Sequence, residues 1–297
     1  SWSSGQGRVN FVYEDPTNPN TLYIGSPAGG IWKSTNSGAN WTPLSDQLPQ
    51  IGVSGIAVDH TNSNVIYIAT GDKDGQDTYS VGVLKSTDGG LTWNITGLSF
   101  TGTSDYAGDI MMHPSNNQIL WCATNSGIFK TSNGGTTWTN VQSGNFSKGN
   151  IRLRPSDPTT VYAVSNTKFY KSTNTGDTFT EITTGLPALS GRLNLDVTAA
   201  DANYIYILSA TTGYGFQGVY RSTNSGTNWT KISTAATPAI FDGSGQAGYD
   251  MALAVSSSNK DEIYTGLLNV WKSTNGGLGF TKLNDWSNPS GPAYTHA

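Results

Sequence analysis

Residues 33–41 read Lys-Ser-Thr-Asn-Ser-Gly-Ala-Asn-Trp, and closely similar nine-residue segments recur five times further along the chain. The Ser or Thr of successive copies stands at positions 34, 86, 131, 172, 222 and 273, so the spacings are 52, 45, 41, 50 and 51 residues. A period of this length indicates a repeat architecture in which each repeat is one supersecondary unit. We call the copies boxes 1 to 6: Lys33 to Trp41, Lys85 to Trp93, Lys130 to Trp138, Lys171 to Phe179, Arg221 to Trp229 and Lys272 to Phe280.

The rest of each repeat predicts four short strands, A to D, with the box as the turn between strands C and D. An aromatic residue holds one fixed place in the run before each box: Tyr23, Tyr67, Trp121, Tyr162, Tyr206 and Tyr264. Gly, Asn, Pro and Ser separate the runs, and no segment has a helical period. The sequence therefore predicts an all-β propeller of four-stranded antiparallel blades. Six blades are visible, at about 7–49, 50–99, 104–146, 147–187, 190–235 and 246–285.

The ends of the chain leave the blade number open. Residues 1–297 are expected to form one propeller domain, and residues 286–297 look like the entry to another blade. The alternatives are a six-bladed ring and a piece of a seven- or eight-bladed ring that belongs to a longer chain with further domains.

The box turn can be understood from its residue types. Its Asn or Asp side chain can accept hydrogen bonds from nearby backbone N–H groups, and its Gly permits a positive φ. The closing Trp or Phe buries a large ring. We therefore interpret the Asn or Asp of each box as structural: Asn36, Asp88, Asn133, Asn174, Asn224 and Asn275.

Composition excludes several classes of function. The formal net charge is −4 and only 12% of residues are charged, which argues against a surface for nucleic acid. No run of about 18 apolar residues exists, so no membrane insertion is expected. The single cysteine, Cys122, lies in an apolar run and is expected to be a buried thiol. His113 is interpreted as a residue of the A–B turn, and no histidine is a candidate catalytic base.

The boxes resemble the Asp-box, or BNR repeat, of sialidases, sortilin-like receptors and xyloglucan-cleaving propellers, whose pattern is Ser-x-Asp-x-Gly-x-x-Trp. Asn replaces the Asp in five of the six copies. Segments such as residues 59–71 are also similar to large Bacteroidetes proteins exported by type IX secretion. The resemblance implies a bacterial protein that is secreted or held at the cell surface.

Loop lengths favour one end of the blades for function. The boxes and the A–B turns share one end, the box end, and both are short. The B–C and D–A loops share the other, the loop end, and hold the long segments 71–80, 211–217 and 233–249. Because binding residues concentrate on loops of a rigid scaffold, we expect a ligand at the loop end. The candidate residues are Tyr79, Tyr106, Asp109, Arg192, Tyr214, Phe216, Tyr249 and Asp250, with the aromatic ones exposed.

One acidic loop is a candidate metal site. Asp72, Asp74 and Asp77 place three carboxylates within six residues, and Ca²⁺ prefers oxygen ligands on a flexible turn. The alternative is a solvated acidic turn. No other cofactor is indicated.

The arginines and carboxylates of the chain do not match a known catalytic arrangement closely enough to assign catalysis. A sialidase needs an arginine cluster, and the chain has five arginines, of which Arg154 and Arg221 belong to repeat positions. In the xyloglucan-cleaving relatives an Asp stands just before strand C of the first blade, where this chain has Pro27. An inverting glycosidase needs two carboxylates about 6.5–9.5 Å apart. The sequence selects no pair among Asp72, Asp74, Asp105, Asp109, Asp196 and Asp250, so no catalytic residue is assigned.

The sequence thus favours a secreted or cell-surface binding or adhesion propeller that recognises a carbohydrate or a protein at the loop end. The alternative function is a glycoside hydrolase that acts on a polysaccharide with a pair of Asp carboxylates.

Overall fold

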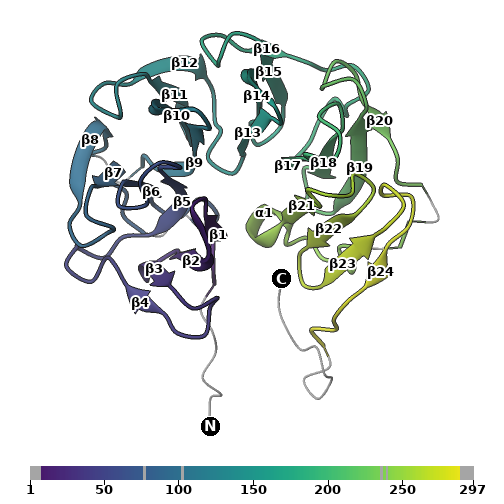
Figure 1. The fold of residues 1–297 in the computed structure, drawn as a ribbon. Coiled ribbons are helices and arrows are strands. Elements are labelled where there is room, and N and C mark those ends of the chain that lie inside the picture. Colours follow the sequence, from purple (N-terminus) through teal and green to yellow (C-terminus); the bar gives the residue numbers. More distant parts are fainter. Residues whose placement is uncertain (1–7, 76–77, 102–103, 235–236, 239, 288–297) are drawn as a thin grey trace. The chain divides into compact units, whose positions relative to one another are not determined.

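A computed structural model describes residues 8–75, 78–101, 104–234, 237–238 and 240–287. These residues form six sheets of four antiparallel strands, and in every sheet the strands pair in chain order (Figure 1). The predicted fold class, an all-β propeller with four-stranded antiparallel blades, is confirmed. In the described part of the chain one helix is present and no helix is long and apolar enough to cross a membrane.

The chain divides into two compact units, Ser1–Ser147 and Lys148–Ala297, and each is described by itself. Unit 1 holds blades 1 to 3. Blade 1 contains β1 (Phe11–Asp15), β2 (Asn18–Ser26), β3 (Gly30–Ser34) and β4 (Thr42–Pro43). Blade 2 contains β5 (Val53–Val58), β6 (Ile66–Thr70), β7 (Gly82–Ser86) and β8 (Asn94–Ser99). Blade 3 contains β9 (Ala107–His113), β10 (Asn116–Thr124), β11 (Gly127–Thr131) and β12 (Thr139–Ser143).

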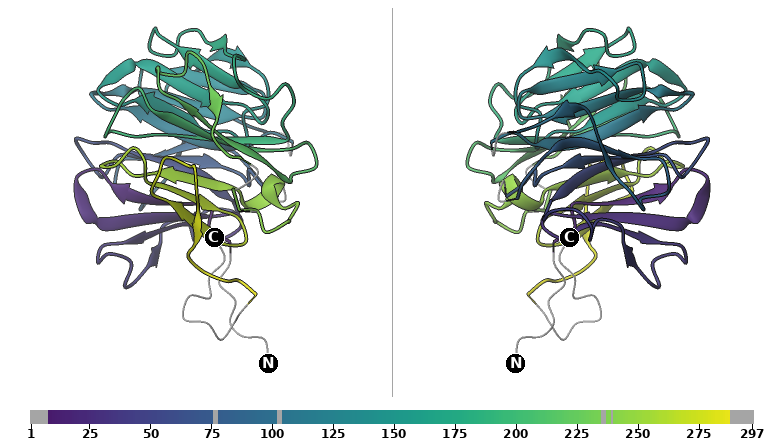
Figure 2. Two further views of the ribbon diagram at one scale, coloured as in Figure 1. Left: turned by 90° about the vertical axis from the view of Figure 1, so that its right-hand side faces the viewer. Right: turned by 90° about the vertical axis from the view of Figure 1, so that its left-hand side faces the viewer.

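Unit 2 holds blades 4 to 6 and the helix. Blade 4 contains β13 (Ile151–Arg154), β14 (Asp157–Val164), β15 (Phe169–Ser172) and β16 (Thr180–Glu181). Blade 5 contains β17 (Arg192–Val197), β18 (Ile205–Ala210), β19 (Phe216–Ser222) and β20 (Thr230–Lys231). Helix α1 (Ala247–Asp250) precedes blade 6, which contains β21 (Ala252–Val255), β22 (Ile263–Gly266), β23 (Val270–Ser273) and β24 (Thr281–Lys282). The strands of each blade lie side by side in Figures 1 and 2. The predicted further blade at 286–297 lies almost wholly outside the described residues.

The six boxes share one hydrogen-bonded turn. In box 1 the Ser34 hydroxyl accepts from the N–H groups of Asn36 at 3.3 Å and Gly38 at 2.9 Å, and donates to Asn36 Oδ1 at 2.9 Å. Asn36 Oδ1 also accepts from the N–H of Asn40 at 2.9 Å. The same four bonds recur in boxes 2 to 6. The box glycines have φ between 72° and 95°, a range that favours residues without a Cβ. The structural interpretation of the box Asn and Asp residues agrees with this geometry.

A cation and an aromatic residue face each other across strands B and C of every blade. The register pairs Tyr23 with Lys33, Tyr67 with Lys85, Trp121 with Lys130, Tyr162 with Lys171, Tyr206 with Arg221 and Tyr264 with Lys272. The aromatic residue on strand B is buried in five of the six pairs. In four pairs, those of Lys33, Lys85, Lys130 and Lys272, the ring attracts the ammonium that lies over it. In blade 1, for example, Lys33 Nζ lies 5.4 Å from the centre of the Tyr23 ring.

Within each unit, a box packs against the preceding blade. In unit 1, Trp93 Nε1 of box 2 donates to the Leu44 carbonyl of blade 1 at 2.8 Å, and Tyr67 Oη of blade 2 donates to the Gly134 carbonyl of box 3 at 2.9 Å. In unit 2, the Trp229 ring of box 5 meets the Phe169 ring of blade 4 edge-on at 4.8 Å.

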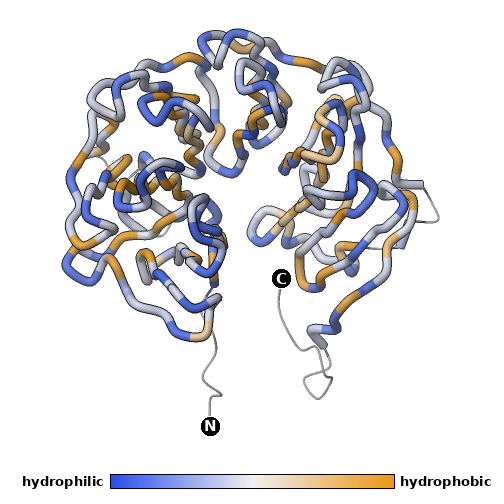
Figure 3. The backbone as a smooth tube through the Cα atoms, viewed as in Figure 1, coloured by the Kyte–Doolittle hydropathy of each residue, from blue (hydrophilic) through white to orange (hydrophobic). Residues whose placement is uncertain are grey.

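Within each unit, the core lies between neighbouring sheets and is built mainly from strands A to C. Strand β6 shows why: its sequence Ile-Tyr-Ile-Ala-Thr is buried on both faces, as expected for an apolar, β-branched strand between two others. Figure 3 shows hydrophobic strand segments alternating with hydrophilic turns along the chain. Cys122 on β10 is fully buried, and burial raises the pKa of its thiol. His113 ends β9 at the A–B turn, as predicted.

Candidate ligand-binding loops

The long loops gather at the loop end of each unit. In unit 2, the B–C loop of blade 5 meets the connection that carries α1. We call this gathering the unit 2 loop cluster and define it by Lys148, Arg192, residues 211–216 and residues 240–251. It brings together five of the predicted ligand-binding residues: Arg192, Tyr214, Phe216, Tyr249 and Asp250.

Tyr214 stands at the tip of a tight turn. Its N–H donates to the Thr211 carbonyl at 2.8 Å, and the Thr211 N–H donates to the Gly215 carbonyl at 2.8 Å. The Tyr214 backbone has φ 61°, an unusual value for a side-chain-bearing residue that is held by the closed turn. The ring packs over Gly248 of α1, where an added Cβ would lie 3.0 Å from ring carbons. Tyr214 is still 38% exposed, so one part of the ring is supported and another faces solvent.

The side chains of two cations, Arg192 and Lys148, donate hydrogen bonds to carbonyls of the short helix α1. Arg192 Nη1 donates to the Ala247 carbonyl at 3.2 Å, and Lys148 Nζ donates to the Gly248 carbonyl at 2.6 Å. Both carbonyls belong to a helix too short to satisfy them itself. Arg192 is buried, so its guanidinium supports the helix rather than facing solvent. Tyr249 is 46% exposed on the same helix, and Asp250 ends it half-buried.

Phe216 supports the cluster rather than presenting a free ring. It begins β19, is half-buried, and meets the buried Phe241 ring edge-on at 5.3 Å. This arrangement connects the B–C loop of blade 5 to the segment that leads into α1.

In unit 1, the predicted calcium loop is engaged by an arginine. The Asp72 side chain is buried and forms an ion pair with Arg8. Its carboxylate also accepts from the N–H groups of Asp74 at 3.1 Å and Gly75 at 2.9 Å. Asp77 lies outside the described residues, and among the described ones no three His, Cys, Asp or Glu side chains gather around a common point. Calcium binding here stays a prediction.

The other candidate ligand-binding residues of unit 1 differ in how deeply their side chains are buried. Tyr79 is 67% exposed, but Tyr106 is only 8% exposed and its hydroxyl accepts from Ser147 Oγ at 3.3 Å. The prediction that Tyr106 is an exposed aromatic residue is therefore wrong. Its Cβ lies close to Gly71, where an added Cβ would come 2.8 Å from it, so Tyr106 packs against the start of the acidic loop. Asp109 is half-buried on β9, and its backbone packs closely against Gly55.

The carboxylates considered for catalysis include two that are engaged by arginines. Asp72 pairs with Arg8, and Asp196 pairs with Arg152 Nε at 3.0 Å while accepting from the Val255 N–H at 2.8 Å. A general acid must instead be free to hold and donate a proton.

Sequence reasoning missed Arg8 and Lys148. Both are cations outside the six box positions, which account for six of the sixteen Lys and Arg residues. Asking which cations break the repeat would have found them.

The blades, boxes and cation–aromatic pairs define a propeller of the Asp-box type. The family model for sortilin, neurotensin receptor 3 (Sortilin-Vps10) matches residues 126–285, and the chain belongs to this family.

Two xyloglucanases are similar in sequence to this chain, one over about half of it and one over nearly all of it. Xyloglucanase Xgh74A of Acetivibrio thermocellus is 30% identical over 152 residues, which are 47% of this chain and 18% of that protein. A Paenibacillus xyloglucanase is 24% identical over 301 residues, which cover 97% of this chain and 26% of that protein. The chain therefore spans about a quarter or less of the length of these relatives.

Solved structures show the same fold. The GH74 xyloglucanase from Xanthomonas campestris has a TM-score of 0.72 at 17% identity, and the match covers 98% of this chain and 48% of that one. YCF48 from Cyanidioschyzon merolae has a TM-score of 0.60 at 14% identity, and the match covers 94% of this chain and 86% of that one. At these identities the likeness supports the fold alone.

Proposed function

We propose that this chain binds a polysaccharide through the unit 2 loop cluster. The observation that carries the proposal is the pair of exposed tyrosines, Tyr214 and Tyr249. Tyr214 stands on a closed turn, and Tyr249 belongs to a helix held by Lys148 and Arg192. The names of the curated relatives support a plant-type β-glucan such as xyloglucan as the first ligand to test.

The physical reason is pre-organisation. A tyrosine ring offers an apolar face to the C–H groups of a sugar and a hydroxyl to its polar edge. A ring that is already fixed by a closed turn, as Tyr214 is, loses little conformational entropy when a sugar stacks on it. A site of this kind needs no catalytic group.

We also propose that the protein is secreted or held at the surface of a bacterial cell. Polysaccharides such as xyloglucan are found outside the cell, and xyloglucanases of bacteria are among the relatives.

The test is a titration with xyloglucan oligosaccharides by calorimetry. We expect Tyr214→Ala and Tyr249→Ala each to weaken binding by about tenfold, since one lost aromatic contact is worth about 1 kcal/mol or more. Tyr79→Ala is the matched control, because it removes a more exposed tyrosine from unit 1. Unchanged affinity in both unit 2 variants, with unchanged melting temperatures, would contradict the site. No saturable binding by the native protein would contradict the ligand.

A second candidate function is glycoside hydrolysis, which the xyloglucanase relatives favour. The test is the release of reducing ends from xyloglucan by the native protein. Turnover that is lost in Asp250→Asn or Asp109→Asn would replace the binding proposal with hydrolysis. Binding without turnover would leave the first proposal in place.

A further inference from the structure

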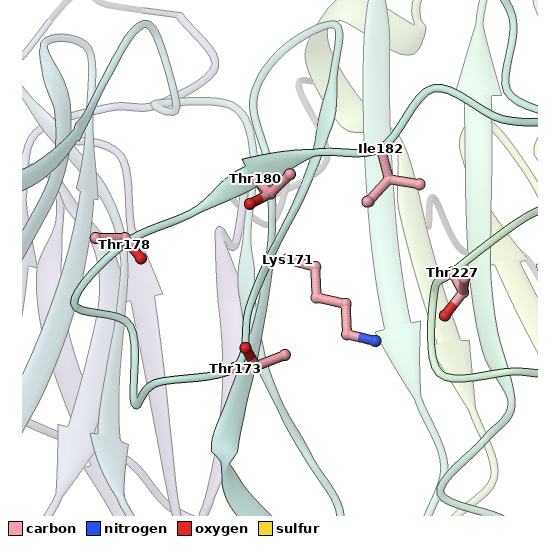
Figure 4. A pocket seen from close by; sticks show the side chains of 6 residues that line it. All are labelled: Lys171, Thr173, Thr178, Thr180, Ile182 and Thr227. Atoms are coloured by element: carbon pink, nitrogen blue, oxygen red, sulfur yellow. The ribbon is translucent and has the colours of Figure 1, made fainter.

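A pocket lies at the box end of unit 2, away from the loops considered above. Its volume is about 260 Å³, and its lining comes from two adjacent blades: Lys171, Thr173, Thr178, Thr180 and Ile182 of blade 4 and Thr227 of box 5. Figure 4 shows the Lys171 side chain reaching from β15 across the pocket toward Thr227. The lining thus combines one ammonium, four threonine hydroxyls with their methyl groups, and one aliphatic side chain.

Lys171 differs from the other box cations. Lys33, Lys85, Lys130 and Lys272 each lie 5.1–5.9 Å from the ring that they face across strands B and C. Lys272 also pairs with Glu262 at 3.1 Å, and Arg221 lies over the Tyr204 ring at 5.7 Å. Within the described ranges, the Lys171 side chain makes no such ring contact and no hydrogen bond or ion pair.

Arg154 is a second cation close to Lys171. It ends β13 and lies near Tyr162, the aromatic partner that the register assigns to Lys171. The guanidinium is fixed by Asp157, Asn203 and Ser225, each at 3.2 Å. Burial is the largest cause that lowers the pKa of Lys171, and the charge of Arg154 lowers it further, while Asp157 raises it. Because the charge of Arg154 acts on both Tyr162 and Lys171, this repulsion favours a position of the ammonium in the pocket over one on the Tyr162 ring.

Box 5 supplies a polar wall through Thr227. Thr227 follows the box glycine, and the same position holds a threonine, Thr136, in box 3 but Leu91 in box 2 and Leu278 in box 6. A threonine leaves a polar opening where a leucine would place an apolar side chain. Box 5 is fixed against blade 4, because the Trp229 ring meets Phe169 edge-on at 4.8 Å and the Trp229 backbone N–H donates to the Thr184 carbonyl at 3.0 Å.

We propose that this pocket binds one monosaccharide unit that carries an oxyanion, such as a uronate or a sulfated sugar. The Lys171 ammonium would receive the oxyanion, the threonine hydroxyls the ring hydroxyls, and Ile182 with the threonine methyl groups the C–H face. The volume is below the roughly 300–1,000 Å³ of pockets that enclose drug-sized ligands, which suits one sugar ring rather than an oligosaccharide. An ammonium hydrogen-bonded to an oxyanion is among the stronger polar contacts available.

The experiment is an NMR titration of the full chain with sodium glucuronate, glucose and inorganic sulfate as separate probes. We expect saturable binding of glucuronate, with the Lys171 ammonium signals shifting as the pocket fills. Lys171→Gln is expected to weaken glucuronate binding by about tenfold, and Thr227→Val, which keeps the shape and removes a hydroxyl, by a few-fold. Glucose is expected to bind far more weakly than glucuronate.

Two control variants test whether glucuronate binding depends on this pocket. Lys33→Gln removes the equivalent cation of blade 1, which lies on its tyrosine ring, and is expected to leave glucuronate affinity unchanged. Lys85→Gln, which removes the equivalent cation of blade 2, is expected to do the same. The pocket shares no lining residue with the unit 2 loop cluster, so failure of the proposed function there leaves this result independent. Equal affinity for sulfate and glucuronate would overturn the sugar and leave a simple anion site. Equal losses in Lys33→Gln and Lys171→Gln, or no saturable binding, would overturn the pocket.

Discussion

Asp88 is the one charged residue among the six Asn or Asp residues of the boxes. Hydrogen-bond donors around its carboxylate stabilise that charge. The Thr92 hydroxyl donates to it at 2.6 Å, the Thr92 N–H at 2.9 Å and the Ser86 hydroxyl at 2.7 Å. The hydrogen bond from the Thr92 hydroxyl is the largest cause that lowers the pKa of Asp88, to about 2 from an ordinary 3.8. In box 4 the neutral Asn174 uses its Nδ2 to donate to the Thr178 hydroxyl instead, at 3.0 Å, so the same turn works with either direction of this bond.

This shift predicts a pH dependence that Asp88→Asn removes. Because the pKa is lower in the folded chain, the carboxylate stabilises the fold above about pH 3.8, and this contribution is lost as the pH falls toward 2. We expect the difference in unfolding free energy between the native chain and Asp88→Asn to shrink over that window. Urea unfolding at several pH values between 2 and 5 measures it. A difference that stays constant over the window would contradict the prediction.

The ion pair between Arg8 and Asp72 predicts an effect on the free energy of unfolding. Asp72 is buried, so Arg8→Ala leaves its charge without the guanidinium and is expected to cost about 3 kcal/mol of unfolding free energy. The double variant Arg8→Ala/Asp72→Asn is expected to recover part of this, because the buried charge is gone. Thermal melts of the three proteins, with calcium or with a chelator, also test the predicted metal site. If calcium stabilises Arg8→Ala but not the double variant, Asp72 is a ligand.

At the scale of the element, the box combines a backbone requirement with a packing requirement. Gly226 has φ 74°, and a Cβ there would lie 2.9 Å from Phe169 Cζ of the preceding blade. Gly243 has a similar φ of 72° but no atom within 4 Å of such a Cβ.

These two glycines predict a matched pair of variants. Gly243→Ala is expected to cost about 1 kcal/mol, the backbone strain alone. Gly226→Ala adds the displacement of the Phe169 ring and is expected to cost about 2–3 kcal/mol in total. Urea denaturation measures both. Equal costs would show that the box does not depend on its contact with blade 4.

The elements that could be predicted are those set by local chemistry. The box turns, the A–B turn at His113 and the buried strand at Cys122 depend on residues close in sequence, so spacing alone locates them. Tyr106 could not be placed, because its burial depends on Gly71 and Ser147, which are distant in sequence. Helix α1 has one turn and no hydrophobic period, and long-range bonds from Lys148 and Arg192 hold its carbonyls.

At the scale of the whole molecule, the six boxes repeat the same buried hydroxyl. Ser86 in unit 1 and Ser222 in unit 2 each accept two backbone N–H groups and donate to the box Asp or Asn. We therefore expect Ser86→Ala and Ser222→Ala to cost similar amounts, about 1–2 kcal/mol each, because each leaves buried N–H groups without an acceptor. Unfolding in urea, followed by tryptophan fluorescence, compares them. Costs that differ by several kcal/mol would mean that the repeats are not equivalent.

The candidate sites also divide into one that the sequence predicts and one that depends on contacts distant in sequence. The repeat identified the loop end and most of the residues there, because insertions break an otherwise regular period. The threonine pocket was hidden for the opposite reason: Lys171 occupies a regular position, and only the neighbouring Arg154 and Thr227 change what it does.

The docking of a box on the preceding blade of its own unit also has a consequence for synthesis on the ribosome. Blade 1 presents the Leu44 carbonyl before Trp93 has been made, and blade 4 presents Phe169 before Trp229. Within each unit, a newly emerging blade therefore meets a finished surface rather than waiting for one. The direction of these contacts matches the direction of translation, so blades can be added one at a time from the N-terminal side.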